Sequence, residues 1–171
     1  MKCEKCKKAG STKSTYTNRT YCDSHFMEMI SRRIRKDLRV SQKIDIKKEY
    51  GFARSTSHET AIAKHFLSEI FGGRLKLSKN SPNAIMPRSL DKEVKEFLEE
   101  FLENKESKQH LLNPLRTVLE EEIKEICRIL GIRYPKNNET NEILESIEEK
   151  YPGTKFSLMK SMKEIKPKNK K

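Results

Sequence analysis

Two short ligand pairs near the amino terminus constrain this chain more than any other feature. Cys3-x-x-Cys6 is followed, after fifteen residues, by Cys22-x-x-His25. Each pair forms a tight turn that presents two ligands to one ion, and together they complete the tetrahedron of three thiolates and one imidazole found in closed zinc sites. The spacing therefore predicts Zn²⁺ bound by Cys3, Cys6, Cys22 and His25, with residues 13–20 forming the hairpin of a zinc ribbon.

A four-ligand site leaves no open coordination position, so this metal is expected to hold structure and not to perform chemistry. The ribbon has too little apolar content to fold alone, and metal binding would supply its folding energy. Two alternatives stay open, namely scattered thiols beside an incidental histidine and an iron–sulfur cluster. The histidine ligand and the lack of any redox feature argue against the cluster.

The net charge of +12 is distributed unevenly along the 171 residues. Residues 1–54 hold 15 Lys/Arg against 6 Asp/Glu, residues 88–150 hold 11 against 16, and residues 151–171 hold 7 against 1. A basic pole of this kind attracts polyanions, of which nucleic acid is the commonest in a cell. The alternative is a surface that serves solubility, with a loose lysine tail.

The amino-terminal residues lack the apolar segment of a signal peptide. No apolar run approaches the roughly 18 residues that a membrane span needs. The four cysteines favour metal binding or free thiols over a disulfide framework. We therefore expect a cytoplasmic protein with no membrane attachment.

A basic amphipathic helix is predicted from Cys22 to about Gln42, where the chain has neither Gly nor Pro. Apolar residues recur there at helical spacing, at Phe26, Met29, Ile30, Ile34 and Leu38. The cationic residues lie largely off this stripe, and we predict that they contact RNA phosphates: Arg32, Arg33, Arg35, Lys36 and Arg39. The alternative is the solvated face of an ordinary amphipathic helix.

The remaining pattern predicts further helices with short extended pieces between them. Ser57 is the expected N-cap of a helix to Phe71 that Gly72-Gly73 ends. Residues 50–53 form a strand end or a loop, and residues 110–115 form a short buried strand. The other helices are expected at residues 90–102, 118–130, 143–151 and 156–162.

Catalytic motifs are missing from the sequence. The paired glycines follow a helix and do not open one, which is wrong for cradling a phosphate. There is no nucleophile elbow, no H-E-x-x-H and no second metal cluster. Cys127 is expected to be a core thiol, and His58, His65 and His110 to be packing residues. The sequence thus predicts no self-sufficient active site, although an enzyme with an unrecognised site stays an alternative.

Several segments resemble the tRNA 2-thiolation proteins, which are adenylating PP-loop-type enzymes and their inactive partners. The segment Tyr21-Cys-Asp-Ser-His-Phe26, leading into Arg32-Arg-Ile-Arg-Lys36, is similar to the start of these proteins. Three later segments resemble the non-catalytic second subunit, cytoplasmic tRNA 2-thiolation protein 2. They are Thr60–Arg74, Asn113-Pro-Leu-Arg116 with the following Glu120–Ile123, and Tyr151-Pro-Gly-Thr-Lys-Phe-Ser157.

The chain departs from the active members of this family in two ways. They carry a Ser-Gly-Gly-x-Asp-Ser phosphate loop after the basic helix, whereas here Ile44–Gly51 runs directly toward the Ser57 helix. We therefore predict that the nucleotide-binding strand–loop–helix unit is deleted. The catalytic cysteines are also absent, since Gly131-Ile-Arg-Tyr134 continues as Pro-Lys-Asn-Asn. Both departures predict a chain that is not an enzyme.

Together these features predict an α/β protein with three parts. Residues 1–44 form the zinc ribbon and basic helix, residues 45–162 a truncated Rossmann-like domain of the PP-loop ATPase type, and residues 163–171 a flexible basic tail. The resemblance implies an accessory subunit in wobble-uridine thiolation that binds tRNA and a catalytic PP-loop thiolase partner. Apolar surface exposed by the lost elements would bind that partner. The alternative is a free-standing zinc-ribbon protein that binds nucleic acid in transcription or at the ribosome.

Overall fold

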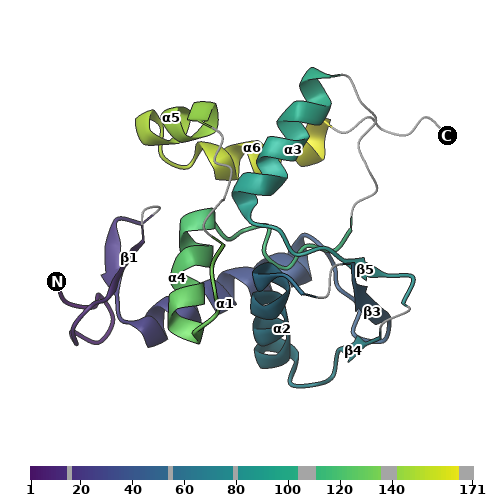
Figure 1. Cartoon of the computed structure of the whole chain (residues 1–171), viewed down its shortest axis with the longest axis horizontal. Helices are drawn as coiled ribbons and strands as arrows, with labels where there is room; N and C mark the ends of the chain where they lie inside the picture. Colours follow the sequence, from purple (N-terminus) through teal and green to yellow (C-terminus); the bar gives the residue numbers. More distant parts are fainter. Residues whose placement is uncertain (15–16, 54–55, 79–80, 104–110, 136–141, 166–171) are drawn as a thin grey trace.

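The protein is described here from a computed structural model, which covers residues 1–14, 17–53, 56–78, 81–103, 111–135 and 142–165. Helices predominate, and two small sheets accompany them (Figure 1). The helices are α1 (Asp23–Val40), α2 (His58–Phe71), α3 (Leu90–Leu102), α4 (Glu120–Leu130), α5 (Glu142–Lys150) and α6 (Thr154–Ile165). The strands are β1 (Thr12–Ser14), β2 (Arg19–Tyr21), β3 (Glu49–Phe52), β4 (Lys76–Leu77) and β5 (Ala84–Ile85).

The amino-terminal residues form the predicted hairpin, which leads directly into the long helix. Strands β1 and β2 are antiparallel, with Thr12 opposite Tyr21 and Ser14 opposite Arg19. Helix α1 follows with Cys22 as its N-cap residue. Figure 1 shows this hairpin and the second sheet at opposite ends of α1. The long helix therefore connects the amino-terminal head, residues 1–22, to the rest of the fold.

The second sheet is parallel and has the order β4-β3-β5. Parallel neighbours need a crossover connection, which α2 provides between β3 and β4. Leu112 extends the sheet through a parallel bridge to Ile85. Gly51 in β3 is required by close approach, because a Cβ atom there would lie 2.7 Å from the carbonyl oxygen of Ser78. The strand order and direction place the carboxyl ends of β3 and β5 at one edge of the sheet.

The apolar core has two parts. The larger part joins α1, α2, α4 and the parallel sheet, and the smaller part joins α3, α5 and α6. Helix α1 contributes fully buried residues at every fourth position: Phe26, Ile30, Ile34 and Leu38. Burial of such a side chain stabilises a fold by about 1.5–3 kcal/mol each, so this one face fixes α1 against the core.

Comparison with the sequence pattern confirms the α/β fold and most of its helices. Helices α2 and α3 have the predicted residues, with Ser57 as N-cap and Gly72 as C-cap of α2 at a φ of 56°. Helix α6 is longer than predicted. The predicted strand at residues 110–115 is reduced to the single bridge at Leu112, and His110 lies outside the described residues.

The structure bears on the predicted tail and on the expected absence of a membrane span only within the described residues. The last part of the predicted tail, residues 166–171, lies outside the described residues, and α6 continues to Ile165. Within the described ranges, every helix is too short or too polar to span a lipid bilayer.

Candidate functional site

The head brings the four predicted ligands together. In the first turn the backbone N–H of Cys3 donates to the Lys8 carbonyl at 2.7 Å, and that of Lys7 donates to the Cys3 carbonyl at 3.0 Å. The second ligand pair lies at the start of α1, where the N–H of Phe26 donates to the Cys22 carbonyl. Gly10 allows the two pairs to approach, because a Cβ atom there would lie 2.4 Å from Thr20.

The ligand atoms have the spacing of a site for one ion. The Nδ1 atom of His25 lies 3.4 Å from Cys3 Sγ and 3.3 Å from Cys22 Sγ, and Cys6 Sγ lies 3.8 Å from Cys22 Sγ. All four atoms lie within 4.8 Å of one another. A tetrahedral ion with metal–sulfur bonds near 2.3 Å and metal–nitrogen bonds near 2.0 Å separates its ligands by about 3.5–3.8 Å. The head therefore fits a mononuclear metal ion. A four-iron cluster is larger than a single ion, so its ligand atoms must lie farther apart than those of the head.

The thiols of the head have perturbed acidities. Burial alone would raise the pKa of Cys3, but hydrogen bonds from the backbone at Cys22, Cys6 and Lys5 and the contact with His25 lower it to about 5. At Cys6 a backbone hydrogen bond from Lys8 opposes burial and the neighbouring thiols, and the net effect raises its pKa. Thiols packed this closely repel one another when ionised, and a bound cation removes that repulsion.

Helix α4 holds the head through Arg128. Its guanidinium donates to Asp23 at 2.7 Å and to Thr12 at 3.3 Å, and its Nε donates to Glu125 at 2.8 Å. The hydrogen bond from Arg128, and a second from Ser11, lower the pKa of Asp23. The residue next to Cys22 is thereby fixed by an element more than 100 positions away in sequence.

The basic residues of α1 divide into two groups. Arg32, Arg35, Lys36 and Arg39 are exposed, although Arg32 also forms an ion pair with Glu28. Arg33 is largely buried instead: it pairs with Glu122 of α4 and lies 5.6 Å from the centre of the Phe156 ring. Contact of all five residues with RNA stays a prediction.

After α1 the described residues form a strand and then a helix. Strand β3 ends at Phe52, and α2 begins at His58 with its N-cap Ser57 accepting a hydrogen bond from the Thr60 N–H at 3.1 Å. The chain therefore has a strand and a helix at the point where a strand–loop–helix unit was predicted to be deleted. The phosphate-loop enzymes carry a glycine pair between these elements, whereas residues 53–57 of this sequence have no glycine.

Polar residues that the sequence did not mark as functional surround the start of α2. Lys92 Nζ lies 3.0 Å from Glu59 and 3.8 Å from Glu120, and the Tyr134 hydroxyl donates to Glu120 at 2.8 Å. His58 stands edge-on to Tyr134 with 5.5 Å between ring centres, and its Nε2 atom is buried without a hydrogen bond. Burial lowers the pKa of His58, so its imidazole is neutral near pH 7.

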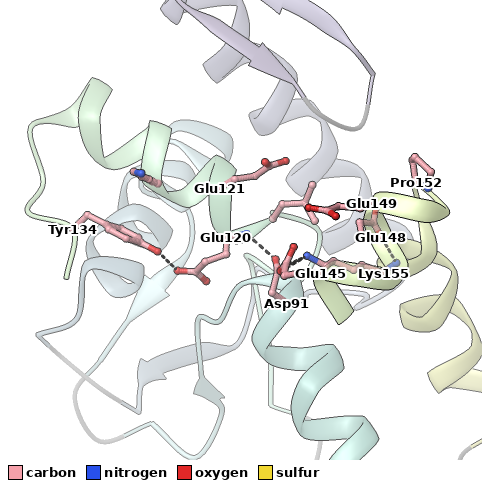
Figure 2. A pocket seen from close by; sticks show the side chains of 11 residues that line it. Asp91, Glu120, Glu121, Tyr134, Glu145, Glu148, Glu149, Pro152 and Lys155 are labelled. Carbon is pink, nitrogen blue, oxygen red and sulfur yellow. Dashed lines mark hydrogen bonds and ion pairs between the residues drawn. The ribbon is translucent and has the colours of Figure 1, made fainter. Parts of the chain in front are cut away.

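A cavity of about 470 Å³ opens beside this group (Figure 2). Carboxylates dominate its wall, and the buried ammonium of Lys155 donates to Asp91 at 2.5 Å and to Glu145 at 2.7 Å. Glu148 accepts the backbone N–H groups of Gly153 and Lys155. The carboxylates around Lys155 are thus used within the fold, and their negative charge makes this cavity unsuited to phosphate.

The one cysteine outside the head is poorly placed for chemistry. Cys127 is buried in α4, and burial, with Glu120 and Glu59 nearby, raises its pKa to about 11. A thiol with this pKa is protonated at neutral pH and is a weak nucleophile. Its position confirms the expected core thiol.

Comparison with known proteins finds a likeness among solved structures. No family model matches the sequence, and no curated protein matches it. Among solved structures, the fold matches the U34-tRNA thiolase NcsA from Methanococcus maripaludis with its [4Fe-4S] cluster. The match has a TM-score of 0.78 at 13% sequence identity and covers 99% of this chain and 88% of that one. At this identity the likeness establishes the fold, that of a PP-loop thiolase in truncated form.

The prediction of a chain that is not an enzyme is contradicted. Its first basis was a deleted strand–loop–helix unit, whereas β3 and α2 follow α1 in the described chain. The fold of a tRNA thiolase, moreover, extends over 99% of the chain and is not confined to the head. The expected reduction of the chain to an inactive partner therefore does not hold.

Proposed function

We propose that this protein is an enzyme of tRNA thiolation. The observation that supports the proposal is the likeness of its fold to the U34-tRNA thiolase along 99% of the chain. The reaction class is ATP-dependent activation of a tRNA uridine oxygen, followed by its replacement with sulfur. By the general rule for open parallel sheets, the reacting groups would meet at the carboxyl edge, where β3 leads into α2.

The metal of the head is proposed to be Zn²⁺ in a structural role. Three thiolates and one imidazole are a usual zinc ligand set, and the 3.3–3.8 Å spacing supports a single tetrahedral ion. With four protein ligands the ion has no open position. Its part would be to fold the head and to present α1.

A nucleotide phosphate would lie at the start of α2. The first N–H groups of a helix have no intrahelical acceptor, and the helix dipole favours an anion there. The connection lacks the glycines of the usual phosphate loop but carries an arginine and hydroxyl side chains, at positions 54–57.

The exposed cations of α1 are proposed to bind the tRNA. Arg32, Arg35, Lys36 and Arg39 present guanidinium and ammonium groups to solvent, which suits the phosphates of an RNA strand. The basic surplus of residues 1–54 would raise the rate of encounter with such a polyanion.

A second subunit is proposed to supply the sulfur. The chain has four cysteines, of which three are head ligands and the fourth, Cys127, is buried with a raised pKa. A sulfur carrier needs an accessible thiolate. We therefore expect a complex with a PP-loop thiolase subunit that contributes reactive cysteines.

Two measurements test this function. Deletion of the gene should abolish 2-thiouridine in bulk tRNA, measured by mass spectrometry of nucleosides, and the wild-type gene should restore it. A gene with Ser57→Pro, which removes the N-cap hydroxyl that holds the start of α2, should fail to restore 2-thiouridine. A gene with Lys124→Ala, at an exposed position of α4, should restore it. Unchanged thiouridine after deletion would favour a free-standing nucleic-acid-binding protein instead.

A further inference from the structure

A second cavity, of about 560 Å³, lies at the opposite edge of the parallel sheet. It is bounded by the segment after α1, by the amino ends of β3 and β5, by residues 111–116, and by side chains from α3 and α6. Its volume falls within the range of roughly 300–1,000 Å³ that is usual for ligand sites. Polar groups converge on it from these elements: Lys43, Lys48, Tyr50, Asn83, Glu93 and Arg116.

The floor of this cavity combines hydrogen-bond donors and acceptors. Arg116 has only 12% of its side chain exposed, and its Nε is buried without a hydrogen bond, 3.7 Å from Asp37 and 3.9 Å from Glu93. The Tyr50 hydroxyl accepts the Asp45 N–H at 3.1 Å and keeps its own hydrogen for donation. A guanidinium between two carboxylates has its charge compensated, so the floor suits a neutral polar group and not a second anion.

The rim, by contrast, is cationic. Lys43 and Lys48 are exposed there, and Lys43 follows the end of α1, whose last turns carry the exposed Arg35 and Arg39. None of these four residues, nor Lys36, has an ion-pair partner among the described residues. Arg35 and Arg39 lie one turn apart on α1, about 6 Å at the helical rise of 1.5 Å per residue, so with Lys43 and Lys48 the cations extend beyond one phosphate group.

We propose that this cavity binds one unstacked nucleotide of the RNA. Its phosphate would lie at the rim, beside Lys43 and Lys48, and its base would enter the cavity to meet Glu93 and Arg116. The neighbouring phosphates would follow the exposed cations of α1. Single-stranded loops offer such splayed bases, whereas a free mononucleotide would leave the exposed cations of α1 unused. The inference rests on the proposed function, because it assumes an RNA substrate, and it adds a recognition site remote from the edge assigned to the reaction.

Binding of a labelled tRNA transcript can be measured by fluorescence anisotropy between roughly 50 and 200 mM salt. The salt dependence distinguishes the contribution of the rim cations from that of the floor residues. Lys43→Ala and Lys48→Ala should each weaken binding and reduce the salt slope by about 0.7, the value per phosphate on a single strand. Tyr50→Phe should weaken binding at an unchanged slope, because it removes the neutral hydroxyl that donates at the floor. Lys124→Ala, an exposed control that lines the acidic cavity, should change neither. Unaltered binding in both rim variants would overturn the proposal.

Photocrosslinking of the wild-type chain avoids any effect of substitution on folding. A transcript with photoreactive uridines in its loops should label peptides that contain residues 41–50 and 81–84. Labelling confined to the head and the exposed face of α1 would overturn the proposal that the cavity binds a nucleotide. The nucleoside measurement is independent: lost thiouridine without cavity labelling rejects the cavity alone, and cavity labelling with intact thiouridine rejects the thiolation function alone.

Discussion

The metal head and the strand–loop–helix unit at the sheet edge are held in place by different forces. The head has two strands of three residues each and few apolar groups, so four ligand atoms within 4.8 Å define its shape. The unit of β3 and α2 is fixed by burial, because α2 contributes Ile62, Ala63 and Phe66 as fully buried residues. Loss of one ligand should therefore unfold the head, whereas polar changes at the sheet edge should leave its backbone in place.

The largest expected effect is that of a head ligand. Cys22→Ser should abolish metal binding and unfold residues 1–22, because the apparent binding energy of a structural zinc, about 10–16 kcal/mol in small zinc modules, is then lost to folding. Metal content by mass spectrometry should fall from one ion per chain to none. Amide NMR signals of β1 and β2 should lose their dispersion, while those of α2 persist.

The matched control for this experiment is Cys127→Ala. Cys127 is the one cysteine outside the head, and its removal should leave the metal content at one ion per chain. A dispersed hairpin spectrum in metal-free Cys22→Ser would contradict the view that the bound metal orders the head.

A smaller loss of stability is expected when the ion pair between Arg33 of α1 and Glu122 of α4 is removed. Arg33→Ala would leave the Glu122 carboxylate, which is 4% exposed, without its cation. Burial already raises the pKa of Glu122 against the opposing effect of Arg33. Removal of one partner from such a pair costs about 3–5 kcal/mol, measured by the shift of the urea midpoint.

Arg35→Ala is the matched control on the same helix. Arg35 is exposed and has no ion-pair partner among the described residues, so its loss should change stability by no more than about 0.5 kcal/mol. It should instead weaken tRNA binding. Equal stability of the two variants would mean that the buried pair does not join α1 to α4.

The sequence was sufficient for features that depend on neighbouring residues. Ligand spacing predicted the head, and the Ser57 cap with the Gly72 end predicted α2. The role of Arg33 was not predictable in this way, because its partner lies 89 positions later on α4. The helical pattern shows only that Arg33 follows Phe26 by two turns, at the margin of the buried face.

Strand β3 and helix α2 show a second limit of prediction from the sequence. Strand β3 has four residues, among them Gly51, and its identity as a strand comes from pairing with β4 and β5. Those partners are two residues long and carry no recognisable strand pattern of their own. The glycine motif therefore does not decide whether this strand and helix form, because tertiary pairing of β3 and the apolar face of α2 hold their backbone in place without it.

At the sheet edge, removal of the N-cap of α2 should lower the stability of the fold by about 1 kcal/mol. Ser57→Ala removes the oxygen that accepts the Thr60 N–H at 3.1 Å, and loss of an N-cap typically costs that amount. Ser57→Gly, whose backbone allows water to reach the same N–H, should cost only a few tenths. Thermal unfolding should show this order. A loss of several kcal/mol in Ser57→Ala would mean that the loop, and not apolar burial, holds the unit together.

The smallest expected effect concerns His58, beside the same cap. Burial lowers the pKa of His58 below its ordinary value of 6.5, so the unfolded chain binds the proton more readily than the folded chain. In the window from the lowered pKa up to 6.5, the free energy of unfolding should therefore rise with pH, and above that window this contribution should be constant. His58→Gln should flatten the rise in urea midpoints measured across this window, whereas His65→Gln, on the exposed face of α2, should preserve it. An unchanged profile in His58→Gln would contradict a lowered pKa for His58. The enclosed imidazole would then be as accessible to protons in the folded chain as in the unfolded one.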